Sequence, residues 1–142
     1  QTGKTTLFSE VMVELEASGE YFCILLDFES LVELPVHYFY EELGNELQRW
    51  RENNYPTAPA PTAIRHHVDF INWLKECVAV LGKKGVLIID EFDAISTEIV
   101  RPILSLFRGM YLSRHKPNAK SIHSIILVGV RNLPSLLKLQ IN

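Results

Sequence analysis

Two short groups of residues in this chain are of the types that carry out phosphate chemistry. Gly3, Lys4 and Thr5 match the last three positions of the pattern G-x-x-x-x-G-K-[ST], whose backbone amides, lysine charge and hydroxyl group surround phosphate and Mg²⁺. Asp90 and Glu91 follow four consecutive apolar residues, and neighbouring carboxylates can hold a divalent cation and take a proton from water. The two groups together predict a site that binds phosphate and a metal ion.

The first group is incomplete as a motif. The first glycine of the pattern would lie before residue 1, so either the match is accidental or the chain begins within a phosphate-binding loop. Three matching residues also fit a polar segment that caps a helix. The residues that follow favour the loop, because Leu7, Val11 and Leu15 mark an amphipathic helix. The amino terminus of a helix attracts anions through its unpaired amide groups and its dipole.

Composition restricts the class of protein. The chain has 142 residues, 47% of them apolar and 22% charged, which is typical of one folded domain with its own core. The net charge of −3 provides no basic field of the kind that attracts nucleic acid. Because apolar runs are short and no signal peptide is recognisable, we expect no membrane span and a cytoplasmic location.

The cysteines and histidines form no metal-binding pattern. Cys23 lies in an apolar run and Cys77 in a helical pattern, so we expect two buried free thiols in a reducing compartment. His66 and His67 are adjacent in the sequence. Adjacent helical side chains point about 100° apart, so these two cannot share a metal ion.

Apolar periodicity divides the chain into alternating helices and strands. Continuous apolar runs predict buried strands, and apolar residues three or four positions apart predict helices. Gly19 and Gly82 are expected to end helices, Pro35 to occupy a first helical position and Thr62 to cap a helix. The expected helices cover residues 4–18, 36–53, 64–81 and 102–114, and the expected strands cover residues 21–28, 85–91 and 124–130.

Buried strands that alternate with long helices predict a mostly parallel sheet covered on both faces. Ligands of such sheets bind at the carboxyl ends of the strands, which is where Asp90 and Glu91 are expected. The last predicted strand would deliver Arg131 and Asn132 to the same edge, where a polar side chain could sense a terminal phosphate. A surface turn is the alternative interpretation of these two residues.

Taken together, these segments resemble the AAA-like ATPase domains, which belong to the AAA+/STAND P-loop ATPases of the ASCE division. The resemblance rests on TGKTTL, ILLDF, VLIIDEFDAI, LFRGMY and ILVGVRNL, and it covers nearly the whole chain. It implies an α/β fold, a three-layer P-loop NTPase sandwich whose mostly parallel sheet has the strand order five-one-four-three-two. The first and last core strands would lie outside residues 1–142, so we expect an incomplete domain that begins inside the Walker A loop.

The resemblance also implies cofactors, ATP and Mg²⁺, and a role for each motif. Within a partial ATPase domain at residues 1–142, the Walker A end covers residues 1–6, a proline-rich loop 53–62, Walker B 86–91 and a sensor-like strand 124–132. Nucleotide binding would fall to Thr2, Gly3, Lys4, Thr5 and Thr6, Mg²⁺ binding to Thr5 and Asp90, catalysis to Lys4 and Glu91, and phosphate sensing to Arg131 and Asn132.

The implied function is ATP binding and Mg²⁺-dependent hydrolysis coupled to a conformational switch or signalling module. One alternative is a nucleotide-binding scaffold with negligible turnover, against which Glu91 counts. Another is a DNA-associated ATPase similar to origin-recognition proteins, for which Lys83, Lys84 and residues 113–120 supply a basic cluster and against which the net charge counts. Protein partners or self-association are expected, with nucleic acid the weaker alternative.

Two further features have competing interpretations. Arg101 and Arg108 are candidates for an arginine finger, although solvated helix charges are the simpler interpretation. In the aromatic segment that begins at His37, we expect Phe39 to pack inside and Tyr38 and Tyr40 to lie at the margin; the alternative is a surface for a protein partner.

Overall fold

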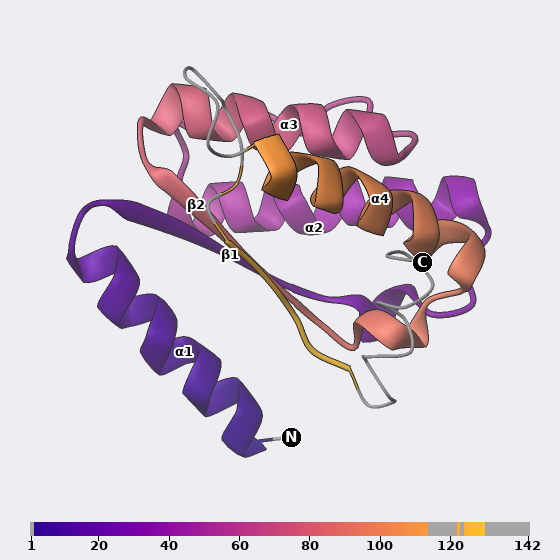
Figure 1. Ribbon diagram of the computed structural model, residues 1–142, viewed down its shortest axis with the longest axis horizontal. Helices are drawn as coiled ribbons and strands as arrows, with labels where there is room; N and C mark the ends of the chain where they lie inside the picture. The colour runs from indigo at the N-terminus through magenta and orange to yellow at the C-terminus, as the bar shows by residue number, and fades with distance from the viewer. Residues whose placement is uncertain (1, 114–121, 123, 130–142) are drawn as a thin grey trace.

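A computed structural model of the chain describes residues 2–113, 122 and 124–129, with side chains from Leu7 onward. Helices and strands alternate along it (Figure 1). In chain order, the elements are α1 (Thr2–Ala17), β1 (Tyr21–Asp27), the short 3₁₀ helix η1 (Phe28–Leu31), α2 (Val36–Asn54), α3 (His67–Leu81), β2 (Lys84–Asp90), the 3₁₀ helix η2 (Phe92–Ala94), α4 (Thr97–Ser113) and β3 (Ser124–Leu127).

The three strands form one parallel sheet in the order β1-β2-β3. The strand that ends in Asp90 is therefore central, as the family resemblance implied. The order also agrees with three consecutive positions, four-three-two, of the sheet that the family resemblance implies. Each parallel connection crosses over through helices, because the chain must return to the same end of the sheet before the next strand begins.

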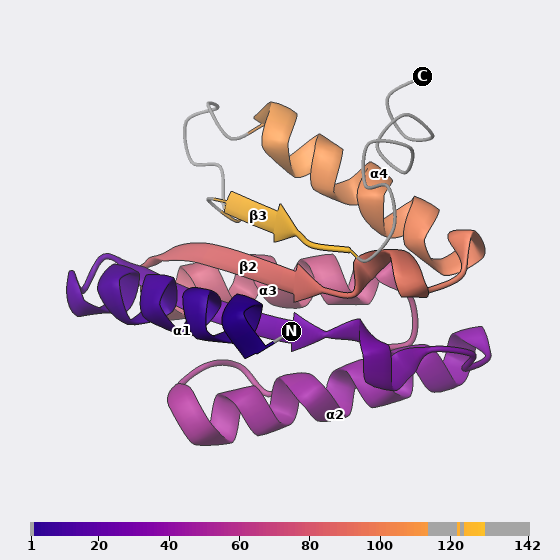
Figure 2. The same ribbon diagram turned by 90° about the horizontal axis from the view of Figure 1, so that it is seen from below.

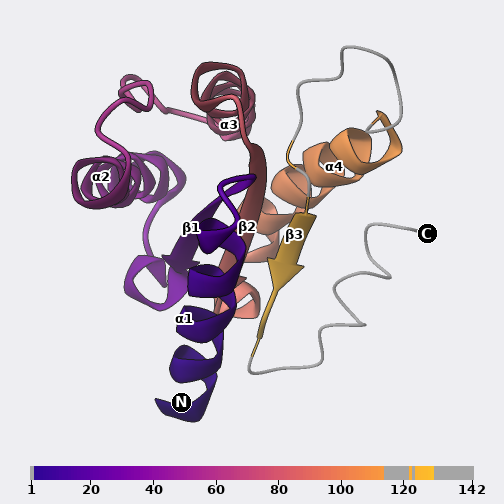
Figure 3. The same cartoon turned by 90° about the vertical axis from the view of Figure 1, so that its left-hand side faces the viewer.

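Helices cover both faces of the sheet, which confirms the predicted three-layer α/β arrangement. α1 lies on one face, while α2, α3 and α4 lie on the other (Figure 3). Alternate residues of the strands divide between the two layers because strand side chains have a period of two. Cys23, Val86 and Ile88 form a small cluster under α1, whereas residues such as Ile24 and Leu87 belong to the larger core on the other face.

The side of α1 that faces the sheet differs from the prediction. Phe8, Met12 and Leu15 pack against the sheet cluster, while Leu7, expected on the buried face, is 56% exposed. Six of the nine residues between positions 7 and 15 are apolar, so the sequence contains two overlapping stripes of helical spacing. Only contact with the sheet selects one of them.

The predicted starts of α3 and α2 were wrong. α3 begins at His67 rather than near Ile64, and Thr62 does not cap it; instead the carboxylate of Asp69 accepts hydrogen bonds from the backbone N–H groups of Arg65 (3.0 Å) and His66 (3.2 Å). This is the N3 half of a capping box, which satisfies amides that precede the helix. Pro35 is the N-cap of α2 rather than its first helical residue.

α4 begins at Thr97, five positions before the predicted start at Pro102. The carbonyl of Ser96 accepts hydrogen bonds from the N–H groups of Ile99 (3.1 Å) and Val100 (3.0 Å), both of which are buried. Proline lacks the N–H that would bond to the preceding turn, so its place inside a helix carries a cost. Burial of the apolar residues on both sides of Pro102 offsets that cost.

The aromatic segment of α2 is more buried than predicted. Phe39 is fully buried as expected, and Tyr38 is exposed, but Tyr40 is only 2% exposed rather than marginal. Further along α2, the indole N–H of Trp50 donates a 2.8 Å hydrogen bond to the carbonyl oxygen of Cys23, which fixes the helix to the edge strand β1. In the described part of the chain, no helix is both long and apolar enough to cross a membrane.

Candidate functional site

The carboxyl ends of β1 and β2 bring two aspartates side by side. In the parallel register, Asp27 is the partner of Asp90, and neighbouring strands lie about 4.8 Å apart. Counting by twos from Cys23 and Val86, both of which face α1, places Asp27 and Asp90 on that same face. The sequence predicted a role for Asp90 only, because the register that brings Asp27 next to it is a tertiary property.

The amino terminus of α1 points toward the same edge of the sheet. α1 runs antiparallel to the strands, so its first turn lies toward the end at which β1 and β2 finish (Figures 2 and 3). That turn contains Gly3, Lys4 and Thr5, and the helix begins at Thr2, two positions before the predicted start. The first four N–H groups of a helix have no partner inside it and, with the helix dipole, favour an anion.

Glu91, the residue that follows β2, has an unusual backbone conformation beside Asp90. Asp90 is 9% exposed and Glu91 is 6% exposed, and Asp90 Oδ1 accepts a 2.9 Å hydrogen bond from the backbone N–H of Glu91. β2 ends at Asp90, so Glu91 is not part of the predicted strand 85–91; it is left-handed, with φ 57° and ψ 35°. This conformation costs a non-glycine residue roughly 1–2 kcal/mol, and such strain is concentrated at functional sites.

β3 is joined to both sides of this turn. The N–H of Val128 donates to the carbonyl of Ile89 (2.9 Å), and the N–H of Phe92 donates to the carbonyl of Val128 (3.0 Å). The two bonds bracket Asp90 and Glu91, so the end of β3 lies beside them. The strand itself ends at Leu127, earlier than predicted, and the sensor candidates Arg131 and Asn132 lie outside the described residues.

The donor set at this edge fits Mg²⁺. Magnesium prefers carboxylate and hydroxyl oxygens, keeps several of its waters and is usually held by one or two carboxylates together with substrate phosphates. Asp90 and Asp27 supply carboxylates of that kind, and one oxygen of Asp27 already accepts a 2.9 Å hydrogen bond from the N–H of Glu29. Within the described residues, no group of three or more acidic, histidine or cysteine side chains forms a ready-made metal cage.

Other candidate residues lie elsewhere. Arg101 and Arg108 are exposed on α4, in agreement with solvated helix charges. Lys83 and Lys84 stand at the amino end of β2, the opposite edge of the sheet, where each ammonium group lies over a tyrosine ring: Lys83 over Tyr55 (5.5 Å) and Lys84 over Tyr21 (5.7 Å). The basic cluster proposed for DNA is therefore separated from Asp90, and its remainder, residues 114–120, lies outside the described chain.

Both cysteines are buried free thiols, as predicted. Burial raises the pKa of the Cys23 thiol to about 11, with a smaller contribution from the charge of Glu16. Burial likewise raises the pKa of Cys77 to about 12. Because the thiolate is the reactive form, neither residue is suited to act as a nucleophile or metal ligand.

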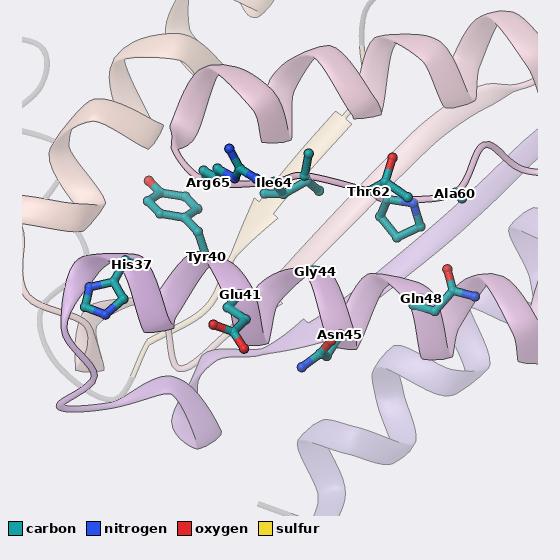
Figure 4. Close-up of a pocket in the computed structure, with 12 residues that line it drawn as sticks. His37, Tyr40, Glu41, Gly44, Asn45, Gln48, Ala60, Thr62, Ile64 and Arg65 are labelled. Atoms are coloured by element: carbon teal, nitrogen blue, oxygen red, sulfur yellow. The ribbon is translucent and has the colours of Figure 1, made fainter.

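A separate cavity of about 760 Å³ lies between α2 and residues 60–65 (Figure 4). Its lining includes His37, Tyr40, Glu41 and Arg65, and it contains none of the residues that the sequence assigned to phosphate or metal. Burial raises the pKa of Tyr40 to about 12, so this phenol is neutral at physiological pH. The cavity is not part of the edge formed by α1, β1 and β2.

Asp93 is a fourth acidic residue at this edge, beside Asp27, Asp90 and Glu91, and like Asp27 it was not predicted from the sequence. Asp93 is 3% exposed, although it lies only three positions after Asp90 in the segment DEFD. The sequence places Asp93 between apolar residues that are expected to be buried. An acidic side chain in such a position is buried too, and burial requires polar partners for its carboxylate. Its place in the fold is that of a buried carboxylate between the turn after β2 and the end of β3.

Comparison with known proteins provides a family assignment. A family model described as "Predicted AAA-ATPase" matches residues 1–135. No curated protein and no solved structure matches the chain. The matched range includes α1, the whole described sheet and the turn after β2.

Proposed function

Because the chain belongs to this predicted AAA-ATPase family, we propose that it carries an ATP site and hydrolyses ATP with Mg²⁺. The observation that carries the proposal is one edge of the sheet. Asp90 ends the central strand there, Glu91 follows it, and the amino terminus of α1 points to the same end of the sheet (Figure 2). Helix amides and a carboxylate at one edge suit the two parts of a metal nucleotide, its phosphates and its cation.

The amino-terminal residues bind the nucleotide in this proposal. Thr2 and Gly3 contribute backbone N–H groups of the first turn of α1, Thr6 contacts the nucleotide from the next turn, and the charge of Lys4 meets the outer phosphates. The hydroxyl of Thr5 and the carboxylate of Asp90 hold the magnesium ion. When bound, Mg²⁺ neutralises negative charge on the phosphate oxygens, which the protein could not do with carboxylates alone.

Glu91 is the proposed general base. It orients the attacking water and accepts its proton, while Arg131 and Asn132 sense the terminal phosphate from the segment that follows β3. Support comes from the backbone of Glu91, which is held in the left-handed region directly after Asp90. A residue with no function at this position would be expected to be glycine or asparagine, because these tolerate a positive φ at lower cost.

The experiment that tests this function compares Glu91→Gln with the wild type in the intact protein. Removing a general base lowers turnover by about 10²–10⁴-fold, whereas the affinity for Mg²⁺-ATP should stay within about twofold because glutamine keeps the shape of the side chain. Lys4→Ala should instead lose ATP affinity. Glu14→Gln, the same substitution at an exposed position on α1, is the matched control and should leave both quantities unchanged.

The outcomes separate the remaining alternatives. Unchanged turnover in Glu91→Gln would remove this residue from the mechanism. Tight ATP binding with no turnover in the wild type would favour a nucleotide-binding scaffold. A conformational switch or signalling module requires, in addition, that ATP and ADP stabilise different conformations, which hydrogen exchange in the two nucleotide states would report.

A further inference from the structure

The buried carboxylate of Asp93 is in direct contact with the backbone of Gly129. A Cβ atom built on Gly129 would lie 2.6 Å from Oδ1, 2.7 Å from Cγ and 2.9 Å from Oδ2 of Asp93. Distances below 3.0 Å are sterically forbidden for carbon, so no side chain fits at position 129 without movement of the carboxylate or of the strand end. Asp93 is 3% exposed, which leaves the carboxylate little space into which to retreat.

Gly129 is needed for space and not for its backbone conformation. Of the described glycines, only Gly19 and Gly82 have a φ in the left-handed region, and both have open space around a built Cβ. Gly129 shows the opposite combination: an ordinary φ and no room for a Cβ. Close approach of two chain segments is one of the two uses of glycine, and it is the use that applies here.

This close approach is a third place at which the end of β3 lies against the turn after β2. The other two are the hydrogen bonds of Val128 with Ile89 (2.9 Å) and Phe92 (3.0 Å), which bracket Asp90 and Glu91 from the strand side. Asp93 lies in η2, after the turn, and its carboxylate lies against Gly129. The end of β3 is thereby held against the turn at residues 89, 92 and 93.

The geometry points to Asp93 and Gly129 as positioning residues for the ATP site. Resting on the proposed function, the inference is that their contact sets where the chain leaves β3 relative to Glu91. Neither Asp93 nor Gly129 needs to touch the nucleotide. They act through the position of the turn that carries Glu91, which lies two positions before Asp93 and is joined to the end of β3 on both sides.

The first variant that tests this role is Gly129→Ala. Its methyl group must displace the carboxylate or the segment, and a displacement of about 1 Å at a catalytic group can cost about 10²-fold in rate. We expect kcat to fall by about that factor while KM for ATP changes less than about threefold. Gly109→Ala is the matched control, because a Cβ at this exposed position in α4 meets no atom within 4 Å.

A second variant distinguishes positioning from general damage. Serine is one bond shorter than aspartate at its polar end, so Asp93→Ser makes room for a methyl group at position 129. The kcat of the double variant Asp93→Ser/Gly129→Ala should therefore be at least about tenfold higher than that of Gly129→Ala alone. Such a non-additive result is explained only by direct contact between the two residues. A merely structural role would lower the melting temperature of each variant without this split between kcat and KM.

The outcomes separate this inference from the proposed function. Suppose that the wild type hydrolyses ATP and that Glu91→Gln abolishes this turnover. If Gly129→Ala then keeps the wild-type kcat, the positioning role is overturned and the proposed function is not. A double variant no faster than Gly129→Ala would also overturn the positioning role. If Gly129→Ala does not fold, Asp93→Ser alone decides, since wild-type kcat without the carboxylate contradicts the inference. Absence of turnover in the wild type would overturn the proposed function, and the positioning role with it.

Discussion

Replacing Gly85 with alanine tests how β1 and β2 pack at the end of the sheet opposite the site. Gly85 pairs with Phe22 in the parallel register, and both are buried. A Cβ at position 85 would lie 2.6 Å from Cδ1 of Ile122 and 2.7 Å from Cζ of Phe22. Phe22 is fully buried beside Trp50, with ring centroids 6.2 Å apart, so its ring has little freedom to move.

The expected magnitude is the difference between two effects. Overpacking a close-packed core costs roughly 1–3 kcal/mol, while alanine restricts the unfolded chain more than glycine does and recovers about 0.4–1 kcal/mol. The difference spans about 0–2.6 kcal/mol. Because atoms of two different side chains lie within 2.7 Å of the added carbon, we expect Gly85→Ala to lower the free energy of unfolding by about 1–2 kcal/mol. For a domain of this size, that corresponds to a fall of about 3–8 °C in melting temperature.

Urea denaturation followed by tryptophan fluorescence would measure the change, with Gly109→Ala as the control. The control should gain about 0.5–1 kcal/mol, because alanine replaces glycine inside an exposed helix with no clash. Ile122→Val removes Cδ1, one of the atoms that the new Cβ would meet. The double variant Gly85→Ala/Ile122→Val should therefore be more stable than the sum of the two single changes in stability predicts.

The site should be unaffected by the same substitution. Gly85 lies at the amino end of β2 and Asp90 at its carboxyl end, so ATP affinity below the melting temperature should equal that of the wild type. Stability of Gly85→Ala equal to or above that of the wild type would refute the packing argument. A large loss of ATP affinity in the folded variant would refute the separation between the two ends of the strand.

Three further predictions concern stability and reactivity. Cys23 and Cys77 should resist thiol reagents in the folded protein and react on unfolding, because burial raises their pKa values to about 11 and about 12; rapid labelling of the native state would contradict this. Trp50→Phe should lower the free energy of unfolding in urea by about 1–3 kcal/mol, because the buried carbonyl of Cys23 loses its donor. Asp69→Ala should lower the free energy of unfolding at neutral pH. Hydrogen bonds from the backbone of Arg65 and His66 lower the pKa of Asp69, so the carboxylate stabilises the folded state only while it is ionised. The difference in stability between the variant and the wild type should therefore shrink below a pH of about 4. A difference that grows as the pH falls would contradict the assignment of Asp69.

The sequence was sufficient for the type and order of the α-helices and strands, because their apolar patterns are strong; the short 3₁₀ helices η1 and η2 were not predicted. The central strand has four consecutive apolar residues before Asp90, and no surface position would tolerate such a run. Boundaries were less predictable. Pro102 suggested a helix start, yet burial of Ile99 and Val100 extends α4 across the proline. Local propensity is worth less than the burial of two large side chains.

The residue types alone determined which positions could bind phosphate and a metal ion. Glycine, lysine, threonine and paired carboxylates can bind these ligands in any fold. The tertiary structure decided which residues share an edge. The parallel register brings Asp27 beside Asp90, and the bonds across Val128 close the turn that holds Glu91 left-handed. The contact between Asp93 and Gly129 joins residues 36 positions apart. No local pattern encodes such contacts, because packing among distant segments creates them.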